Sequence, residues 1–285
     1  MKETAWIRRG AAIALLGAVV AADAQRPYVG FVYPAGGQQG TTVRLHIGGQ
    51  NIDGPYGVYV TGGGVTGRVL EYHWNLNPQD VRLLREQLDA LRRSKAPRTA
   101  EVSNLIRRLQ YRLDHYVQQP ACRSIADIAI VEATIAPDAQ PGERELRLLT
   151  SRGPSNPLVF DVGQFPETVR PPMKTMPKQV LGKEAAALRQ RPPEEEEVRV
   201  TPPCTMNGQI ASREVNRYRF TARRGQRLVV ALRARQLVPY IADAVPGWFQ
   251  PVMAIHDARG REVAFADDYR FKPDPVILFE PPEDG

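Results

Sequence analysis

Aspartates near the end of the chain could present the oxygen ligands that Ca²⁺ prefers. Asp267 and Asp268 are adjacent, Asp257 lies across an expected hairpin from them, and Asp274 follows. Calcium takes about six to eight oxygen ligands, so paired carboxylates in a loop suit such a site. The alternative is a solvated turn whose carboxylates accept bonds from local backbone donors. Asp257, Asp267 and Asp268 are therefore the candidate ligands, and no other cofactor is expected.

The segment from position 80 to position 114 carries nine basic and five acidic side chains, so it holds most of the net positive charge of the chain. Arg108 and Arg112 share one face of an expected helix, and Arg107 flanks them. Such a face could hold anionic polysaccharide, a phosphate-rich cell surface or nucleic acid through charge. No aromatic stacking platform accompanies these arginines, which disfavours nucleic acid. A solvated helix exterior is the alternative.

A proline-rich loop at 238–251 contains the aromatic side chains Tyr240, Trp248 and Phe249. Aromatic rings in an exposed loop could stack on sugar rings or on a peptide. The alternative is that they close one end of a β-sandwich. The three residues are kept as candidate binding residues.

No catalytic residues are expected. The serine elbow G-x-S-x-G and the zinc motif H-E-x-x-H are both absent, and the four histidines are isolated in the sequence. The glycine sets at 36–37, 48–49 and 62–64 lack the lysine of a phosphate loop and are interpreted as turns. Cys122 and Cys204 are the only cysteines, and either a disulfide or free thiols would be compatible with their positions.

Two helices are expected to position the arginines. Asn77 and Pro78 supply a cap and a first turn, and the apolar residues that follow recur at helical spacing until Pro97. A second helix begins near Thr99 and ends at Pro120, with this apolar stripe: Val102, Leu105, Leu109, Leu113 and Tyr116. The short connection at 94–98 predicts an antiparallel hairpin at 77–119.

Alternating β-type runs lie before and after this hairpin, which predicts one β-sandwich at 26–165 with a helical insertion. Residues 166–197 are rich in proline and glutamate and are expected to form a linker. Short strands resume at 198–285, and the turn Asp257 to Gly260 is expected to place its glycine in the left-handed region. The predicted fold class is all-β, with two sandwich domains.

Several short patterns follow one another in the last third of the chain: Asn207 to Ile210, Glu214 to Phe220, Arg224 to Leu228, Asp257 to Gly260, and Asp267-Asp268. In this order they resemble the bacterial pre-peptidase C-terminal (PPC) domain. Glu214 and Asn216 stand where that family places acidic residues, which weakens an inherited calcium site. The closing strand of the family is missing after Phe279, so the resemblance implies a jelly-roll-like domain that continues past Gly285.

The stretch Tyr33 to Val43, with Ala136 to Arg144 and Ser155 to Val162, is similar to IPT/TIG-type immunoglobulin-like domains. Together the two resemblances imply an exported bacterial PPC-domain-containing protein without catalysis of its own. The expected function is adhesion to an extracellular polymer, a cell surface or a protein substrate. The alternative is an accessory or processing segment of a secreted peptidase system.

The first residues predict export. Basic residues precede an apolar run from Gly10 to Ala22, and Ala22-Asp23-Ala24 follows, as in a signal peptide at 1–24. That run is too short for a membrane span, and no later stretch is long enough. The expected location is therefore secreted, periplasmic or cell-surface, with polysaccharide or protein partners and no nucleic acid.

Overall fold

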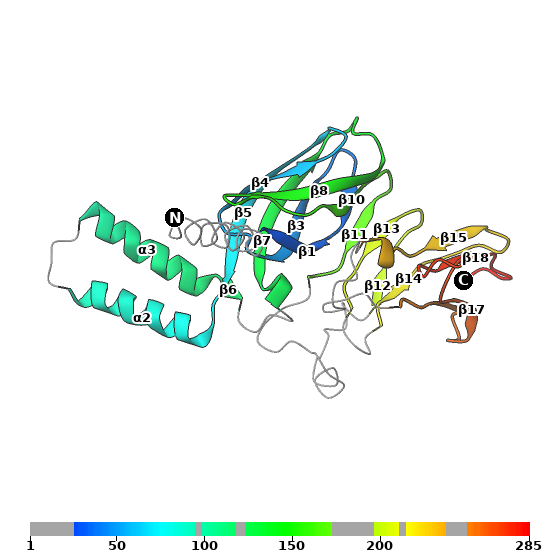
Figure 1. Cartoon of the computed structure of the whole chain (residues 1–285). Helices are drawn as coiled ribbons and strands as arrows, with labels where there is room; N and C mark the ends of the chain where they lie inside the picture. Colours follow the sequence, from blue (N-terminus) through cyan, green and yellow to red (C-terminus); the bar gives the residue numbers. More distant parts are fainter. Residues whose placement is uncertain (1–25, 95–98, 118–122, 173–196, 211–214, 238–249) are drawn as a thin grey trace, which may run out of the picture.

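The computed structural model describes residues 26–94, 99–117, 123–172, 197–210, 215–237 and 250–285. Strands predominate in these ranges, and α2 and α3 are the two α-helices among them (Figure 1). The expectation of a mainly β protein is therefore confirmed. Within the described ranges, no helix has both the length and the apolar character needed to cross a membrane. The expected signal peptide at 1–24 lies outside these ranges.

Two sheets form the first part of the molecule. One has five strands in the order β1 (Tyr28–Tyr33), β3 (Thr42–Gln50), β7 (Asp127–Ile135), β5 (Val65–Asn75) and β6 (Tyr116–Val117). The other has the order β2 (Gly36–Gln38), β10 (Leu158–Gly163), β8 (Gly142–Thr150) and β4 (Pro55–Val60), and β9 (Gly153–Pro154) pairs with β8. The chain changes sheet between β1 and β2, so strands close in sequence contribute to both.

The two sheets share one hydrophobic core. Leu45, Ile47 and Val131 come from the first sheet, Leu146 and Phe160 from the second, and all are fully buried in the same cluster. Alternation along the strands turns these side chains inward, since successive residues of a strand point to opposite faces. Each buried side chain of this size contributes about 1.5–3 kcal/mol, so this cluster dominates the stability of the molecule.

The glycine sets do not all form turns. Gly62, Gly63 and Gly64 have positive φ angles and connect β4 to β5, as expected. Gly36 instead lies in β2, where a Cβ atom would collide with the carbonyl oxygen of Asp161 on β10. The set at 48–49 lies in β3. The interpretation of these two sets as turns was wrong, because the glycines allow close packing against neighbouring strands.

The helices are α2 (Pro78–Arg93) and α3 (Ala100–Asp114). The predicted starts are confirmed: the Asn77 side chain accepts from the Asp80 backbone N–H, and the Thr99 side chain accepts from that of Val102. The first helix ends at Arg93, directly before the loop expected at 94–98, whereas the second helix ends at Asp114, earlier than predicted. Tyr116, expected on the stripe of the second helix, lies in β6, because residues 116–117 pair with the end of β5.

The remaining strands pair two by two. The pairs are β11 (Glu167–Val169) with β13 (Thr205–Asn207), β12 (Glu197–Arg199) with β14 (Arg217–Arg219), β15 (Leu228–Ala231) with β18 (Val276–Phe279), and β16 (Met253–His256) with β17 (Glu262–Ala266). The expected linker at 166–197 thus begins with a paired strand, and its residues 173–196 lie outside the described ranges. The turn between β16 and β17 has Gly260 at φ 78°, as predicted.

Charged side chains connect these strand pairs to the first sheets. Arg233 forms ion pairs of 2.6 Å with both Asp161 on β10 and Glu143 on β8. A second connection comes from β1, where the Tyr33 hydroxyl donates to the backbone carbonyl of Arg170 at 2.7 Å. Burial raises the pKa of this tyrosine, as expected for a phenol enclosed between two parts of the chain.

Candidate functional site: the helical hairpin and its root

The helical hairpin, formed by α2 and α3, extends away from the sheets (Figure 1). The two helices are in contact with each other, and Val81 and Leu88 of α2 are buried. On α3, Leu105 of the predicted stripe is 43% exposed, while Ile106 is half-buried. Both helices therefore present most of their surface to solvent, and the sheets position them only at one end.

The described helices carry seven arginines and five carboxylates. Two exposed ion pairs use part of this charge: Arg82 with Glu86 at 3.7 Å, and Arg93 with Asp89 at 3.5 Å. Such surface pairs contribute at most about 1 kcal/mol, so their role is mainly to cancel charge locally.

Four exposed arginines of the two helices form no ion pair among the described residues. Arg85 and Arg108 have no hydrogen-bond or ion-pair partner among the described residues. Arg92 donates to the side-chain oxygen of Gln110, and Arg107 donates to that of Asn104. Amide partners are neutral, so these two guanidinium groups also remain available to an anion.

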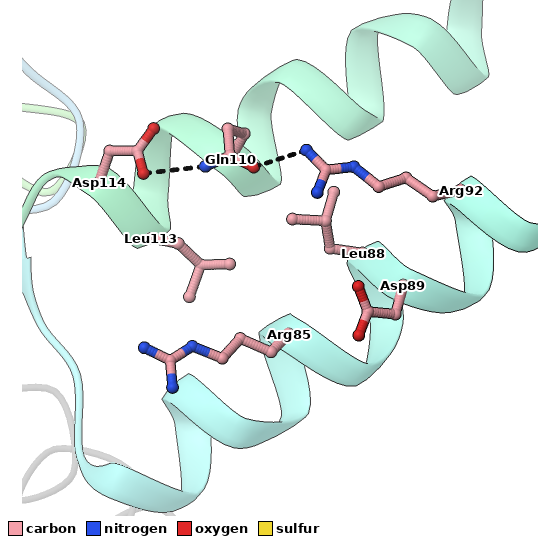
Figure 2. A pocket seen from close by; sticks show the side chains of 7 residues that line it. All are labelled: Arg85, Leu88, Asp89, Arg92, Gln110, Leu113 and Asp114. Carbon is pink, nitrogen blue, oxygen red and sulfur yellow. Dashed lines mark hydrogen bonds between the residues drawn. The ribbon is translucent and has the colours of Figure 1, made fainter.

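A hollow of about 350 Å³ lies between the helices (Figure 2). Leu88 and Leu113 contribute apolar surface to it, Arg85 and Arg92 contribute cations, and Asp89 and Asp114 contribute carboxylates. Figure 2 shows one chain of hydrogen bonds beside it, from Arg92 through Gln110 to Asp114, with distances of 2.8 Å each. The bridge holds Arg92 across the gap between the helices.

The hairpin root, defined as His73, Trp74, Tyr111, Arg112 and His115, joins α3 to β5. The Trp74 ring meets Tyr111 edge to face at 6.1 Å, and the Arg112 guanidinium lies 5.4 Å from its centre. Tyr111 stacks on His115 at 4.0 Å, and His115 meets His73 at 5.5 Å. Such ring contacts and cation–π contacts each contribute about 0.5–1.5 kcal/mol.

Polar groups of the sheet surround the hairpin root. His73 Nε2 lies 3.1 Å from the Glu71 carboxylate, which also forms a 2.6 Å ion pair with Arg44. Although burial opposes ionisation, the bonds from His73 and Arg44 lower the pKa of Glu71 overall. Burial lowers the pKa of His46, and Arg44 and His73 add to that effect. The root is thus attached to a network of charged groups on β3 and β5.

The structure separates the three predicted arginines. Arg107 and Arg108 are exposed on α3, whereas Arg112 is half-buried against Trp74 and has a buried Nε without a partner among the described residues. Helical spacing alone places Arg108 and Arg112 on one face. It does not show that Trp74, at the end of β5, partly covers Arg112.

The predicted calcium ligands have other partners or lie apart. Asp257 accepts bonds from the backbone N–H groups of Arg259 and Arg261 and pairs with the Arg261 side chain at 2.7 Å. Asp274 accepts from the backbone N–H groups that open a short 3₁₀ helix, η2 (Arg235–Leu237). Asp267 and Asp268 are exposed. Among the described residues, no group of three or more His, Cys, Asp or Glu is placed to hold a metal ion.

The aromatic candidates Tyr240, Trp248 and Phe249 lie outside the described residues, as does Cys122. Cys204 is a free cysteine, and burial raises the pKa of its thiol. It borders a second hollow of about 530 Å³ with these other lining residues: Pro166, Thr168, Arg199, Val200, Thr201, Pro202 and Pro203.

Two features of the site were not anticipated from the sequence. Arg85 and Arg92 lie seven residues apart, a spacing that places them on one side of α2 and that would have indicated a shared surface. Tyr111 and His115 lie four residues apart on α3, which marks an aromatic stripe. Their contact with His73 and Trp74 depends on the path of the chain through β6 and is not visible in any local pattern.

A scan of this sequence against protein-family models finds no match. A search of curated proteins finds no match either.

Proposed function

We propose that this protein is an exported, non-catalytic binding module that attaches to anionic extracellular polymer through the arginines of the helical hairpin. One observation carries this proposal: Arg85, Arg92, Arg107 and Arg108 are exposed on a hairpin that extends from the sheets and have no acidic partner among the described residues. Cations presented in this way attract a polyanion and bind it with a strong dependence on salt.

The module would be built from two β-sandwiches. The two sheets that share one core support an immunoglobulin-like sandwich at 26–165. The second, PPC-like sandwich at 198–285 is proposed from the resemblance in sequence, and the β16–β17 hairpin at the turn from Asp257 to Gly260 agrees with it. The alternative function, an accessory segment of a secreted peptidase system, rests on the same resemblance in sequence.

The test measures retention of the purified chain on immobilised polygalacturonate, with neutral dextran as the reference polymer. We expect retention on the acidic polymer at low ionic strength and release at about 0.5 M salt, where charges are screened beyond a few ångströms. The variant Arg85→Glu/Arg108→Glu should lose at least tenfold in affinity.

The matched control is Arg227→Glu/Arg259→Glu, which changes the net charge equally at exposed positions outside the hairpin. It should bind like the parent chain. Equal losses in both variants would assign binding to net charge, and unchanged binding in the hairpin variant would remove the proposal. Equal retention on dextran would also contradict it.

A further inference from the structure

Helix α3 covers only part of its apolar surface. Its apolar side chains recur at helical spacing, yet none of its 15 residues is buried. Leu105 is 43% exposed, and Leu109 is half-buried. A helix of this length is marginally stable by itself and gains most of its stability by packing its apolar face. The contact with α2 leaves part of that face open.

The open surface lies away from the hollow between the helices. On α2, Leu84 and Leu91 are half-buried, and each stands one residue before an arginine that lines the hollow. A helix turns by about 100° per residue, so these leucines are rotated around α2 away from the hollow. On α3, Leu105 precedes Gln110, which lines the hollow, by five residues and is therefore rotated about 140° from it. Leu84, Leu91 and Leu105 are called the leucine face below.

Two opposite charges flank Leu105 on α3. Glu101 precedes it by four residues and Arg108 follows it by three, a spacing that places all three on one side of the helix. Both are exposed and have no hydrogen-bond or ion-pair partner among the described residues. The other carboxylates of the two helices all have partners there: Asp80, Glu86, Asp89 and Asp114.

This pattern is complementary to itself when two α3 helices run antiparallel. A two-fold axis between residues 104 and 105 places Glu101 of each copy opposite Arg108 of the other. Leu105 then lies beside the axis and meets Leu105 of the second copy. In a two-fold contact each such pair occurs twice. A parallel arrangement would instead place Glu101 against Glu101 and Arg108 against Arg108, and like charges at an interface are strongly unfavourable.

We propose that the leucine face joins two copies of this chain, with α3 of one copy antiparallel to α3 of the other, in a contact of four helices. Packing of this kind covers apolar stripes that a single pair of helices leaves open. Arg85 and Arg92 line the hollow and stay accessible in such a dimer. The contact is small, so association should be weak. It does not depend on what the hairpin binds.

The test measures molar mass by sedimentation equilibrium from about 10 µM to about 1 mM chain, the range of weak association. The buffer contains a reducing agent and about 0.15 M salt, which screens repulsion between distant charges. We expect the mass of the parent chain to rise toward that of two chains. Glu101→Arg and Arg108→Glu each place like charges opposite one another, so each should weaken the dimer about fivefold or more.

The exchanged variant Glu101→Arg/Arg108→Glu should dimerise like the parent chain. A cation in the first turn disfavours a helix, and the exchanged variant carries the same change as Glu101→Arg. Recovery of the dimer in the exchanged variant therefore excludes fraying of α3 as the cause of the loss. Circular dichroism of each variant checks that its helical content equals that of the parent chain.

Leu105→Gln should also weaken the dimer. Its control is Tyr59→Gln on β4, where the side chain is 55% exposed, and this variant should dimerise like the parent chain. A parent chain that stays monomeric throughout the concentration range would overturn the proposal. So would a dimer that neither charge reversal weakens, or an exchanged variant that fails to recover it. No polymer is present, so failure here is separate from failure of polymer binding.

Discussion

The guanidinium group of Arg112 lies 5.4 Å from the centre of the Trp74 ring, and this contact joins the helical hairpin to the sheet that carries it. Trp74 also meets Tyr72 at 4.8 Å and packs against the main core. The Trp74 side chain thus contacts both the helical hairpin and the shared core.

Trp74→Ala should detach the hairpin without unfolding the sheets. The loss of two aromatic contacts and one cation–π contact should cost on the order of 2–3 kcal/mol. Hydrogen exchange should accelerate in residues 100–117 and stay slow in β3 and β7. Tyr56→Ala, at a side chain that is 67% exposed, is the control and should change neither.

Arg233→Met should loosen the C-terminal strand pairs. The substitution keeps much of the side-chain volume but removes both ion pairs, with Asp161 and Glu143. Charge-assisted bonds of this kind contribute about 1.5–3 kcal/mol. Exchange protection in β15 and β18 should fall by at least tenfold. Arg227→Met is the control. Equal exchange protection in the two variants would show that the ion pairs of Arg233 are not needed.

Glu167→Gln should stabilise the folded chain near pH 7.5. Burial raises the pKa of Glu167, although a bond from Asn207 opposes the shift. The folded state therefore binds the proton more tightly than the unfolded state, and this group adds stability as the pH falls through the raised pKa. The advantage of glutamine should be present at neutral pH and should disappear toward pH 4. Urea unfolding at both pH values measures it, and an advantage that grows in acid would contradict the sign.

Millimolar Ca²⁺ should leave the melting temperature unchanged. The backbone N–H of Arg261 donates to Asp257 and lowers the pKa of its carboxyl group; desolvation opposes this, and a bond from the Arg261 side chain lowers the pKa further. The oxygens of Asp257 are thus already engaged. Differential scanning calorimetry with and without about 5 mM Ca²⁺ tests this, because that concentration is about five times the dissociation constant of the weakest extracellular calcium sites. A rise in melting temperature that Asp267→Asn/Asp268→Asn abolishes would establish the site.

Local signals in the sequence were reliable guides where local physics decides. The caps at Asn77 and Thr99 and the glycine turn at Gly260 follow from side-chain and backbone preferences within four residues. Signals that depend on distant partners were not. Tyr116 leaves the helix because β5 offers it a strand partner, and Gly36 is placed by the approach of β10.

The candidate site shows the same division. The arginine-rich character of the hairpin is visible in composition alone, and the exposure of Arg107 and Arg108 agrees with it. The diversion of Arg112 and the meeting of His73 with His115 require the three-dimensional path of the chain. Composition thus indicates a charged surface, whereas the contacts that join it to the sheet are a tertiary feature.

The pairing of the later strands in twos makes them dependent on the first sheets. Among the described residues from 197 onward, Ala222 and Ile277 are the buried apolar side chains apart from prolines, and neither belongs to a core cluster. A two-stranded sheet is at best marginally stable by itself. Contacts with the first sheets, such as the ion pairs of Arg233 with Asp161 and Glu143, therefore add stability that the described strand pairs do not obtain from a core of their own.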